Sequence, residues 1–163
     1  MNGALSLVTR ATTWRAARPK TGNRWALVLL DDPVPLVCRP ERALFLSASL
    51  AFEFEPDYRE GHKGGVKAVT RKYIYGLRTG RDEADEFLAW HWHPENRAQP
   101  HVHIRTNHPD VAGLPGMHIP TSRVFFEDVL LFAVSELDAT CRDGAQDLLA
   151  ESLRRTHDWA SWR

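Results

Sequence analysis

Apolar residues recur at every second position through the middle of this chain. Between Ala43 and Phe54 they share one side of an extended segment, while serines and a glutamate share the other. The apolar set is Leu44, Leu46, Ala48, Leu50, Phe52 and Phe54. Successive side chains of a strand point to opposite faces of a sheet, so this period of two predicts a strand rather than a helix. The chain must therefore fold around a β-sheet with one apolar face.

Other segments extend this sheet. Buried or alternating apolar runs predict strands at 25–30, 66–77, 87–93 and 100–105. Three prolines in residues 31–42 indicate an irregular connection, and the Gly-rich residues 55–65 indicate a loop. The order of these segments predicts an antiparallel meander of about four or five strands.

Two helices are expected after the sheet. Apolar residues recur with helical spacing over 121–137, where Thr121 or Ser122 could cap the helix, and a second helix is expected from Gly144 to about Arg155. Asp143 and Gln146 there resemble a capping box. The sequence thus predicts a single α+β domain over residues 25–163, with both C-terminal helices packed on one face of the sheet. Residues 1–24 are expected to be a partly ordered N-terminal segment.

The charge balance and the cysteine content exclude several classes of protein. Lys plus Arg and Asp plus Glu both total 21, so the net charge of zero gives no bulk attraction to nucleic acid or to an anionic membrane. The two cysteines, Cys38 and Cys141, are too far apart in the sequence to indicate a disulfide framework or a zinc ribbon. No apolar run approaches transmembrane length. A cytoplasmic protein is the expectation.

Four of the eight histidines lie in two His-x-His pairs, His91 with His93 and His101 with His103. If the two pairs lie on a hairpin, the simplest register places His93 opposite His101 and His91 opposite His103. All four imidazoles would then project from one face of the two strands. The residues between and beside them, Leu88, Trp90, Trp92, Val102 and Ile104, would form an apolar opposite face.

One interpretation of this histidine face is a metal site. Strand-borne imidazoles from His91, His93, His101 and His103 could bind a divalent metal, of which Zn²⁺, at roughly 2.0–2.1 Å per nitrogen, is the first choice. His118 in the following loop could approach them. The spacing permits this site without being diagnostic of it, and a protein without any cofactor remains the alternative.

A second interpretation is acid–base catalysis on a phosphate ester without a metal. Imidazoles that differ in protonation can take and give a proton. Arg105 continues the histidine face and could hold phosphate, and His118, Thr121 and Arg123 lie at the expected helix start, where free N–H groups favour anions. A third interpretation is a solvated histidine face with a purely structural role.

The chain resembles known families at one short segment. Gln99 to Arg105 looks like the histidine-triad nucleotide-binding motif, but Arg105 occupies the position of the third histidine. The strands over 43–105, the Pro-His-x-His segment at Pro100 and the helix at 121–137 resemble TumE-like bacterial toxins of toxin–antitoxin pairs. A bacterial family that implies nothing about chemistry is equally compatible with these features.

The resemblance implies a toxin-like cytoplasmic protein with a cognate antitoxin or another protein partner. With the residues above, it leads to the hypothesis of a ribonuclease or phosphoesterase-like hydrolase. That enzyme would act on RNA or a nucleotide, using His91, His93, His101, His103 and His118 for acid–base or metal-assisted chemistry. Arg105, Thr121 and Arg123 would hold the phosphate. The alternative is a non-catalytic protein that is stabilised by a metal or that binds a partner in a bacterial complex.

Overall fold

The computed structural model describes residues 4, 6–9, 14–17, 24–29, 33–37, 43–58, 64–105 and 117–159. Its strands are β1 (Trp14–Ala17), β2 (Arg24–Leu29), β3 (Val34–Val37), β4 (Ala43–Asp57), β5 (Gly65–Arg78), β6 (Glu86–His93), β7 (Arg97–Ile104) and β8 (Met117–Pro120). Its helices are the short 3₁₀ helix η1 (Glu83–Asp85) and the α-helices α2 (Phe126–Glu136) and α3 (Ala145–Trp159).

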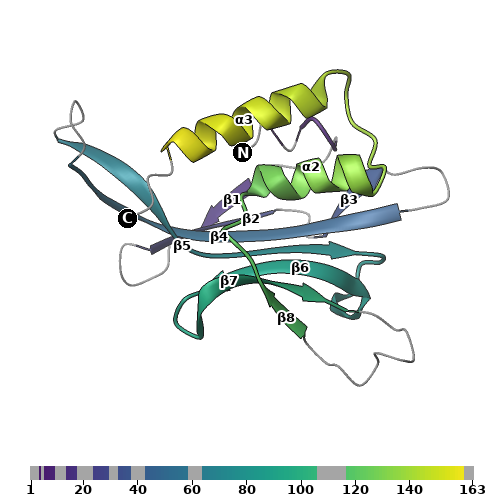
Figure 1. Ribbon diagram of the computed structural model, residues 1–163, viewed down its shortest axis with the longest axis horizontal. Coiled ribbons are helices and arrows are strands. Elements are labelled where there is room, and N and C mark those ends of the chain that lie inside the picture. The colour runs from purple at the N-terminus through teal and green to yellow at the C-terminus, as the bar shows by residue number, and fades with distance from the viewer. Residues whose placement is uncertain are drawn as a thin grey trace.

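All of these strands form one antiparallel sheet of eight strands within the described residues. The order is β1-β2-β4-β5-β6-β7-β8, and β3 pairs with the first part of β4 beside β2 (Figure 1). The α+β class with C-terminal helices is confirmed, whereas the prediction of four or five strands is too low. The central β4–β5–β6–β7 meander corresponds to the strands that the sequence predicts.

The strands missing from the prediction are short and lie in segments rich in proline or glycine, or near the N-terminus. β3 lies in the segment 31–42 that was expected to be irregular, with Pro35 opposite Phe45. Proline is tolerated there because, within the described part of the chain, β3 pairs on one side only, so an absent N–H can face away from the ladder. β8 likewise interrupts the expected loop before Thr121, and β1 lies in the segment that was expected to be only partly ordered.

Both α-helices cover the same face of the sheet, with α2 lying between α3 and the strands (Figure 1). The ring of Phe126 lies 5.7 Å from that of Tyr75, and Phe132 lies 5.5 Å from Trp90. The core between them includes these fully buried side chains: Leu44, Leu46, Tyr73, Leu77, Val129, Leu130 and Leu149. Burial of this apolar area is the main stabilising contribution to the fold.

Helix α2 begins at Phe126, so the predicted start at Thr121 is wrong and neither Thr121 nor Ser122 caps it. Thr121 directly follows β8, and its N–H still donates to the carbonyl of Pro100 on β7 at 2.9 Å. Val124 then donates its N–H to the hydroxyl of Tyr73 at 3.1 Å, and Phe125 donates its N–H to the Asp128 carboxylate at 2.7 Å. The two backbone donors that directly precede the helix are thus satisfied by the side chains of Tyr73 and Asp128.

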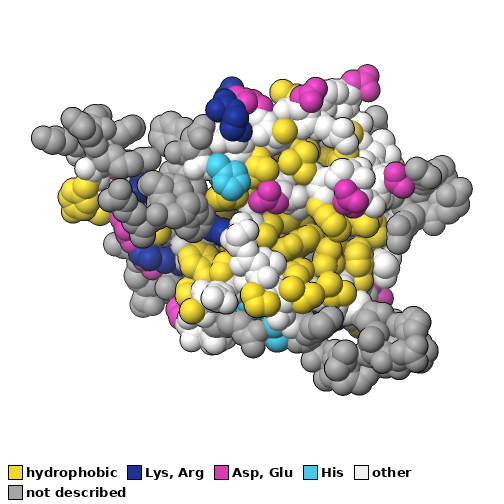
Figure 2. All heavy atoms as spheres, in the orientation of Figure 1, with side chains coloured by type: hydrophobic (Ala, Val, Ile, Leu, Met, Phe, Trp, Pro, Cys, Tyr) yellow, Lys and Arg dark blue, Asp and Glu magenta, His cyan; other side chains and the backbone are white. Residues whose placement is uncertain are grey.

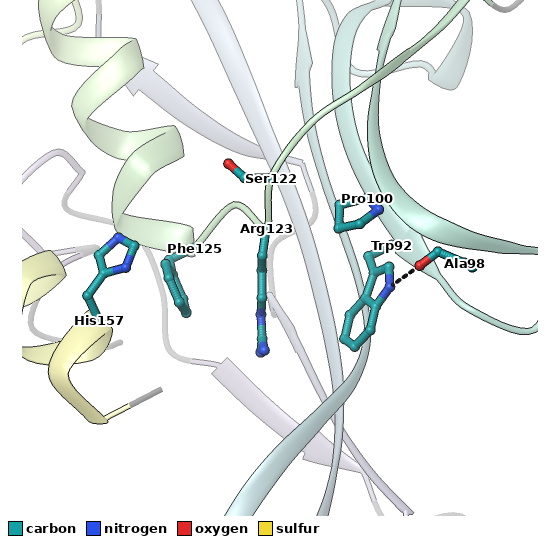
Figure 3. Close-up of a pocket in the computed structure, with 7 residues that line it drawn as sticks. All are labelled: Trp92, Ala98, Pro100, Ser122, Arg123, Phe125 and His157. Carbon is teal, nitrogen blue, oxygen red and sulfur yellow. Dashed lines mark hydrogen bonds between the residues drawn. The ribbon is translucent and has the colours of Figure 1, made fainter. Parts of the chain in front are cut away.

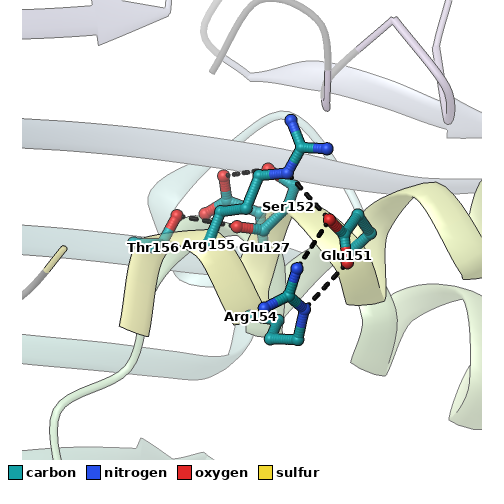
Figure 4. Close-up of polar contacts among 6 residues, drawn as sticks. All are labelled: Glu127, Glu151, Ser152, Arg154, Arg155 and Thr156. Carbon is teal, nitrogen blue, oxygen red and sulfur yellow. Dashed lines mark hydrogen bonds and ion pairs between the residues drawn. The ribbon is translucent and has the colours of Figure 1, made fainter. Parts of the chain in front are cut away.

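Polar contacts join the two helices, and others lie on the exposed side of α3 (Figure 4). The buried Glu127 of α2 accepts a hydrogen bond at 3.1 Å from Ser152 of α3. Glu151 pairs with Arg154 and Arg155 one turn away on the exposed side of α3. Figure 2 shows hydrophobic side chains gathered over α2 and the strands beneath it, with acidic side chains along their upper edge. None of the described helices is long and apolar enough to cross a membrane.

Candidate metal centre

The two His-x-His pairs lie on the neighbouring strands β6 and β7, but not in the predicted register. His91 lies opposite His101, and Ala89 lies opposite His103. The predicted pairing of His93 with His101 is therefore wrong. Strand β7 begins as early as Arg97, which lies opposite His93, and the ladder shifts between His91 and His93. A tight turn closed by the Asn96 N–H on the His93 carbonyl leaves more residues for the ladder than the simplest hairpin assumes.

The four imidazoles nevertheless share one face, as predicted. The slip between the expected and observed registers is an even number of residues, so it preserves which face each side chain occupies. The ring of His91 lies 5.9 Å from those of His93 and His101 and 4.3 Å from that of His103. Trp90 and Trp92 point to the opposite face and pack against the core.

A fifth histidine joins the cluster through β8. His118 was expected in a loop, but it lies on this strand directly opposite His103. Its ring lies 4.1 Å from that of His103 and 4.9 Å from that of His101. We call these five residues, His91, His93, His101, His103 and His118, the histidine cluster. His157 lies outside it on α3, against the ring of Phe125, and His62 and His108 fall outside the described residues.

Ring nitrogens of the cluster are buried without partners. Among the described residues, no hydrogen bond reaches Nε2 of His91, Nδ1 of His93, or Nε2 of His101 and His103. His101 is only 1% exposed, and its Nδ1 lies 3.0 Å from the carbonyl of Gln99. Because a carbonyl only accepts, Nδ1 carries the proton and the Nε2 lone pair points into the cluster. Buried polar atoms without partners are rare, and an ion at this position would satisfy them.

Two histidines of the cluster, His91 and His103, favour the neutral form of the imidazole. Burial and, to a smaller extent, the charge of the neighbouring histidines lower the pKa of His91 to about 3. Burial, His118 and His101 in the same way lower the pKa of His103 to about 4. Both side chains are therefore neutral at pH 7, which is the form that binds metal ions.

Small residues beside the cluster leave room on the sheet for the carboxylate of Glu86. One row of paired residues runs Ser47, Gly76, Ala89, His103 and His118 across the sheet. A Cβ atom on Gly76 would lie 2.6 Å from Oε2 of Glu86 and 2.8 Å from Oγ of Ser47, so the Glu86 carboxylate lies over this glycine. Burial raises the pKa of Glu86 above its ordinary range. Glu86 was not among the predicted site residues, and its only sequence signal is its position directly before a predicted strand.

The predicted phosphate-binding residues do not gather in one place. Arg105 pairs with Glu86 at 3.7 Å and lies near enough to His103 to lower its pKa. Arg123 lies with its guanidinium over the ring of Trp92, on the face that the helices cover. The hydroxyl of Thr121 is buried and has no hydrogen-bond partner among the described residues. The structure thus brings His118 and Arg105 to the histidine face, but not Arg123.

Two triads of the cluster could hold a metal ion, and His101 belongs to both. In each, the ligand nitrogens lie within 4.8 Å of one another: His91, His93 and His101 in the first, and His101, His103 and His118 in the second. His101 offers only Nε2, since its Nδ1 donates to Gln99. It therefore cannot bridge two ions, and the cluster is suited to one ion at a time.

A scan against protein-family models finds no match for the chain, and searches of curated proteins and of solved structures find none either. The class of protein is therefore defined by fold and site alone. It is an α+β protein that carries a cluster of five histidines able to hold a metal ion on the sheet face opposite its helices.

Proposed function

We propose that this protein binds one divalent transition-metal ion through the histidine cluster. The observation that carries the proposal is the set of buried, unpartnered ring nitrogens that the neighbouring strands β6 and β7 direct to one place. An imidazole face without a role would expose these nitrogens to water, because burying a polar group without a partner costs free energy.

The donor set narrows the choice of metal. Neutral imidazoles suit Zn²⁺, Cu²⁺ and Ni²⁺, whereas Mg²⁺ and Ca²⁺ prefer oxygen ligands. We expect Zn²⁺, coordinated by three or four imidazoles with His101 always among them. A set with three protein ligands would leave a position for water or substrate, whereas a set with four would be closed.

The test is the metal content of the purified full-length chain. The protein is stripped with a chelator, incubated with excess zinc chloride, dialysed, and measured by elemental analysis. We expect one zinc ion per chain in the wild type and almost none in the double variant His101→Ala, His103→Ala. His157→Ala is the matched control, because it removes a histidine outside the cluster and should leave the zinc content unchanged.

Circular dichroism shows whether each variant is folded, so that a loss of zinc can be distinguished from a loss of structure. If the double variant does not fold, the exposed His118 provides a milder change, since His118→Ala removes a ligand from one triad only. A folded wild-type chain that retains no zinc, copper or nickel after dialysis would refute the proposal. So would a zinc content that the double variant shares with the wild type.

Metal-assisted hydrolysis of a phosphate ester is the second candidate function. One observation favours it: the side chain of Arg105 is 55% exposed beside His103, where it could hold a phosphate oxygen next to the ion. RNA or a nucleotide would be such a substrate. Release of phosphate or cleaved RNA by the zinc-loaded chain, reduced in Arg105→Gln with the zinc content intact, would support this activity. A zinc-loaded chain without turnover would leave metal binding as the whole function.

A further inference from the structure

A pocket lies on the other side of the β6–β7 hairpin from the histidine cluster. It has a volume of about 440 Å³, which lies within the range of small-molecule sites. Its lining comes from β6, β7, the segment before α2, and α3: Trp92, Ala98, Pro100, Ser122, Arg123, Phe125 and His157. Figure 3 shows the Arg123 side chain between the rings of Phe125 and Trp92.

Arg123 is the charged group of this pocket. Its guanidinium carbon lies 5.3 Å from the ring centre of Trp92 and 5.4 Å from that of Phe125. Both aromatic rings therefore attract the cation and hold it in place. Burial lowers the pKa of Arg123 to about 10, so the side chain stays protonated at neutral pH.

Most of the remaining lining is apolar. The indole N–H of Trp92 donates to the carbonyl of Ala98 at 3.1 Å, so this side chain offers the pocket mainly its ring. Pro100 and Phe125 add further apolar surface. Among the described residues of the lining, His157 is the only ionisable one besides Arg123, and none is acidic. A ligand that matches this lining combines an apolar ring with one negative charge.

We propose that this pocket binds a small aromatic monocarboxylate, with its ring against Trp92 and Phe125 and its carboxylate paired with Arg123. The planar guanidinium can donate two parallel hydrogen bonds to a carboxylate. A phosphate dianion fits less well, since the lining holds a single permanent cation. The Asp128 carboxylate, which accepts a hydrogen bond from the N–H of the lining residue Phe125, would also repel a second negative charge.

Isothermal titration of the full-length chain tests this proposal with three probes. Cinnamate has the ring and the charge, cinnamamide has the same shape without the charge, and acetate has the charge without the ring. We expect cinnamate to bind, and the other two to bind at least about tenfold more weakly, since a charge-assisted pair contributes about one such factor. The Trp92 indole N–H resonance, assigned by its loss in Trp92→Phe, should shift with cinnamate.

Variants of Arg123 test whether this residue binds the carboxylate of the ligand. Arg123→Gln should reduce cinnamate binding to the level of cinnamamide, and Arg123→Lys should fall between the two, because lysine keeps the charge but not the paired donors. Arg154→Gln, which removes an exposed arginine of α3, is the matched control and should bind as the wild type does. If Arg123→Gln does not fold, the comparison of cinnamate with cinnamamide on the wild type decides alone.

Equal affinity for cinnamate and cinnamamide, or no binding of cinnamate at millimolar concentration, would overturn the proposal. The pocket and the histidine cluster can also fail separately. A chain with His101→Ala that has lost zinc should still bind cinnamate, since His101 takes no part in the pocket lining. Retained zinc without cinnamate binding would refute the pocket and leave the metal proposal standing.

Discussion

At the scale of single residues, the metal proposal depends most on His101. It is the most deeply buried member of the cluster, it belongs to both triads, and its hydrogen bond to Gln99 fixes the nitrogen that it offers. Such orienting partners of metal-ligating histidines commonly set the tautomer and the ring direction. The other four histidines each belong to one triad only.

Single substitutions should therefore have unequal effects on zinc affinity. Loss of a residue that only orients a ligand weakens metal binding by about 10- to 100-fold. We expect His101→Ala to weaken zinc binding by more than this, because both triads lose a ligand. His118→Ala should weaken binding less, because the first triad remains complete. Competition with a chromophoric chelator measures both constants. A larger loss in His118→Ala than in His101→Ala would contradict this assignment of ligands.

The stability of the metal-free chain should depend on pH through the same residues. The pKa values of His91 and His103 fall from 6.5 to about 3 and about 4 on folding. Between the folded and unfolded pKa values, the unfolded chain binds more protons than the folded chain does. The two neutral histidines therefore contribute fully to stability above about pH 6.5, and this contribution is lost as the pH falls toward 3. Urea denaturation with a chelator present, from pH 7 to pH 4, measures this slope.

Acid also weakens other interactions, so the comparison needs a variant. The double variant His91→Gln, His103→Gln removes the two titrating groups and should lose less stability over the same pH range than the wild type. If both proteins lose equal stability between pH 7 and pH 4, the two histidines do not titrate as described.

The sequence predicted the face of the cluster but not its pairing. Histidines alternate with Trp90 and Trp92, and side chains of a strand point alternately to its two faces. Because the tryptophans are expected to be buried in the core, the histidines are expected on the opposite face. Register depends on where the turn closes, and Pro94 to Asn96 carry no Asn-Gly or Asp-Gly signal that would fix it. A slip of two residues leaves the hydrophobic pattern unchanged, so that pattern could not reveal it.

At the scale of elements, β8 completes the cluster and was the hardest strand to predict. Its four residues, Met117 to Pro120, are too few to show a clear alternation and follow a segment rich in glycine and proline. β8 forms a strand because it pairs with β7, and the sequence of β8 alone does not reveal that pairing. The helix start was misplaced for the same reason, since Thr121 donates to Pro100 of β7 and does not belong to α2.

The entry to α2 depends on a contact that local sequence does not reveal. Tyr73 of β5 accepts the Val124 N–H, 51 residues away, and stacks on Tyr75 at 4.9 Å. We expect Tyr73→Phe to lower the free energy of unfolding by about 1 kcal/mol, since it leaves that backbone donor unpaired. Chemical denaturation measures the change.

Tyr75→Phe is the matched control for this prediction. It removes the hydroxyl of the neighbouring ring, for which the described residues show no hydrogen bond, so we expect a smaller change in stability. A Tyr73→Phe variant as stable as the wild type would show that the contact with Val124 contributes nothing to the attachment of α2.

At the scale of the whole molecule, the two faces of the sheet have different roles. The helices cover one face and form the core with it (Figure 1). The histidine cluster lies on the other face, near the β8 edge of the strand order. An ion held by the first triad would join β6 to β7, and an ion held by the second would join β7 to β8. Metal binding should thus add stability to the sheet without any change in the helices.

Zinc should therefore raise the melting temperature of the chain. An ion that binds only the folded state at 100 times its dissociation constant adds about 2.7 kcal/mol to the free energy of unfolding. Thermal melts with zinc chloride and with a chelator measure the difference, which we expect to vanish in His101→Ala. A wild-type melting temperature that zinc does not change would contradict the stabilising role.

X-ray absorption spectroscopy of the zinc-loaded chain tests the central claim most directly, because it reports the atoms bound to the ion. The histidine cluster predicts a first shell of nitrogen, with at most one or two oxygens, at about 2.0–2.1 Å, together with the outer-shell scattering of imidazole rings. At least three imidazoles should be required to fit the spectrum. Sulfur at about 2.3 Å, or a shell of oxygens alone, would place the metal elsewhere and contradict the account.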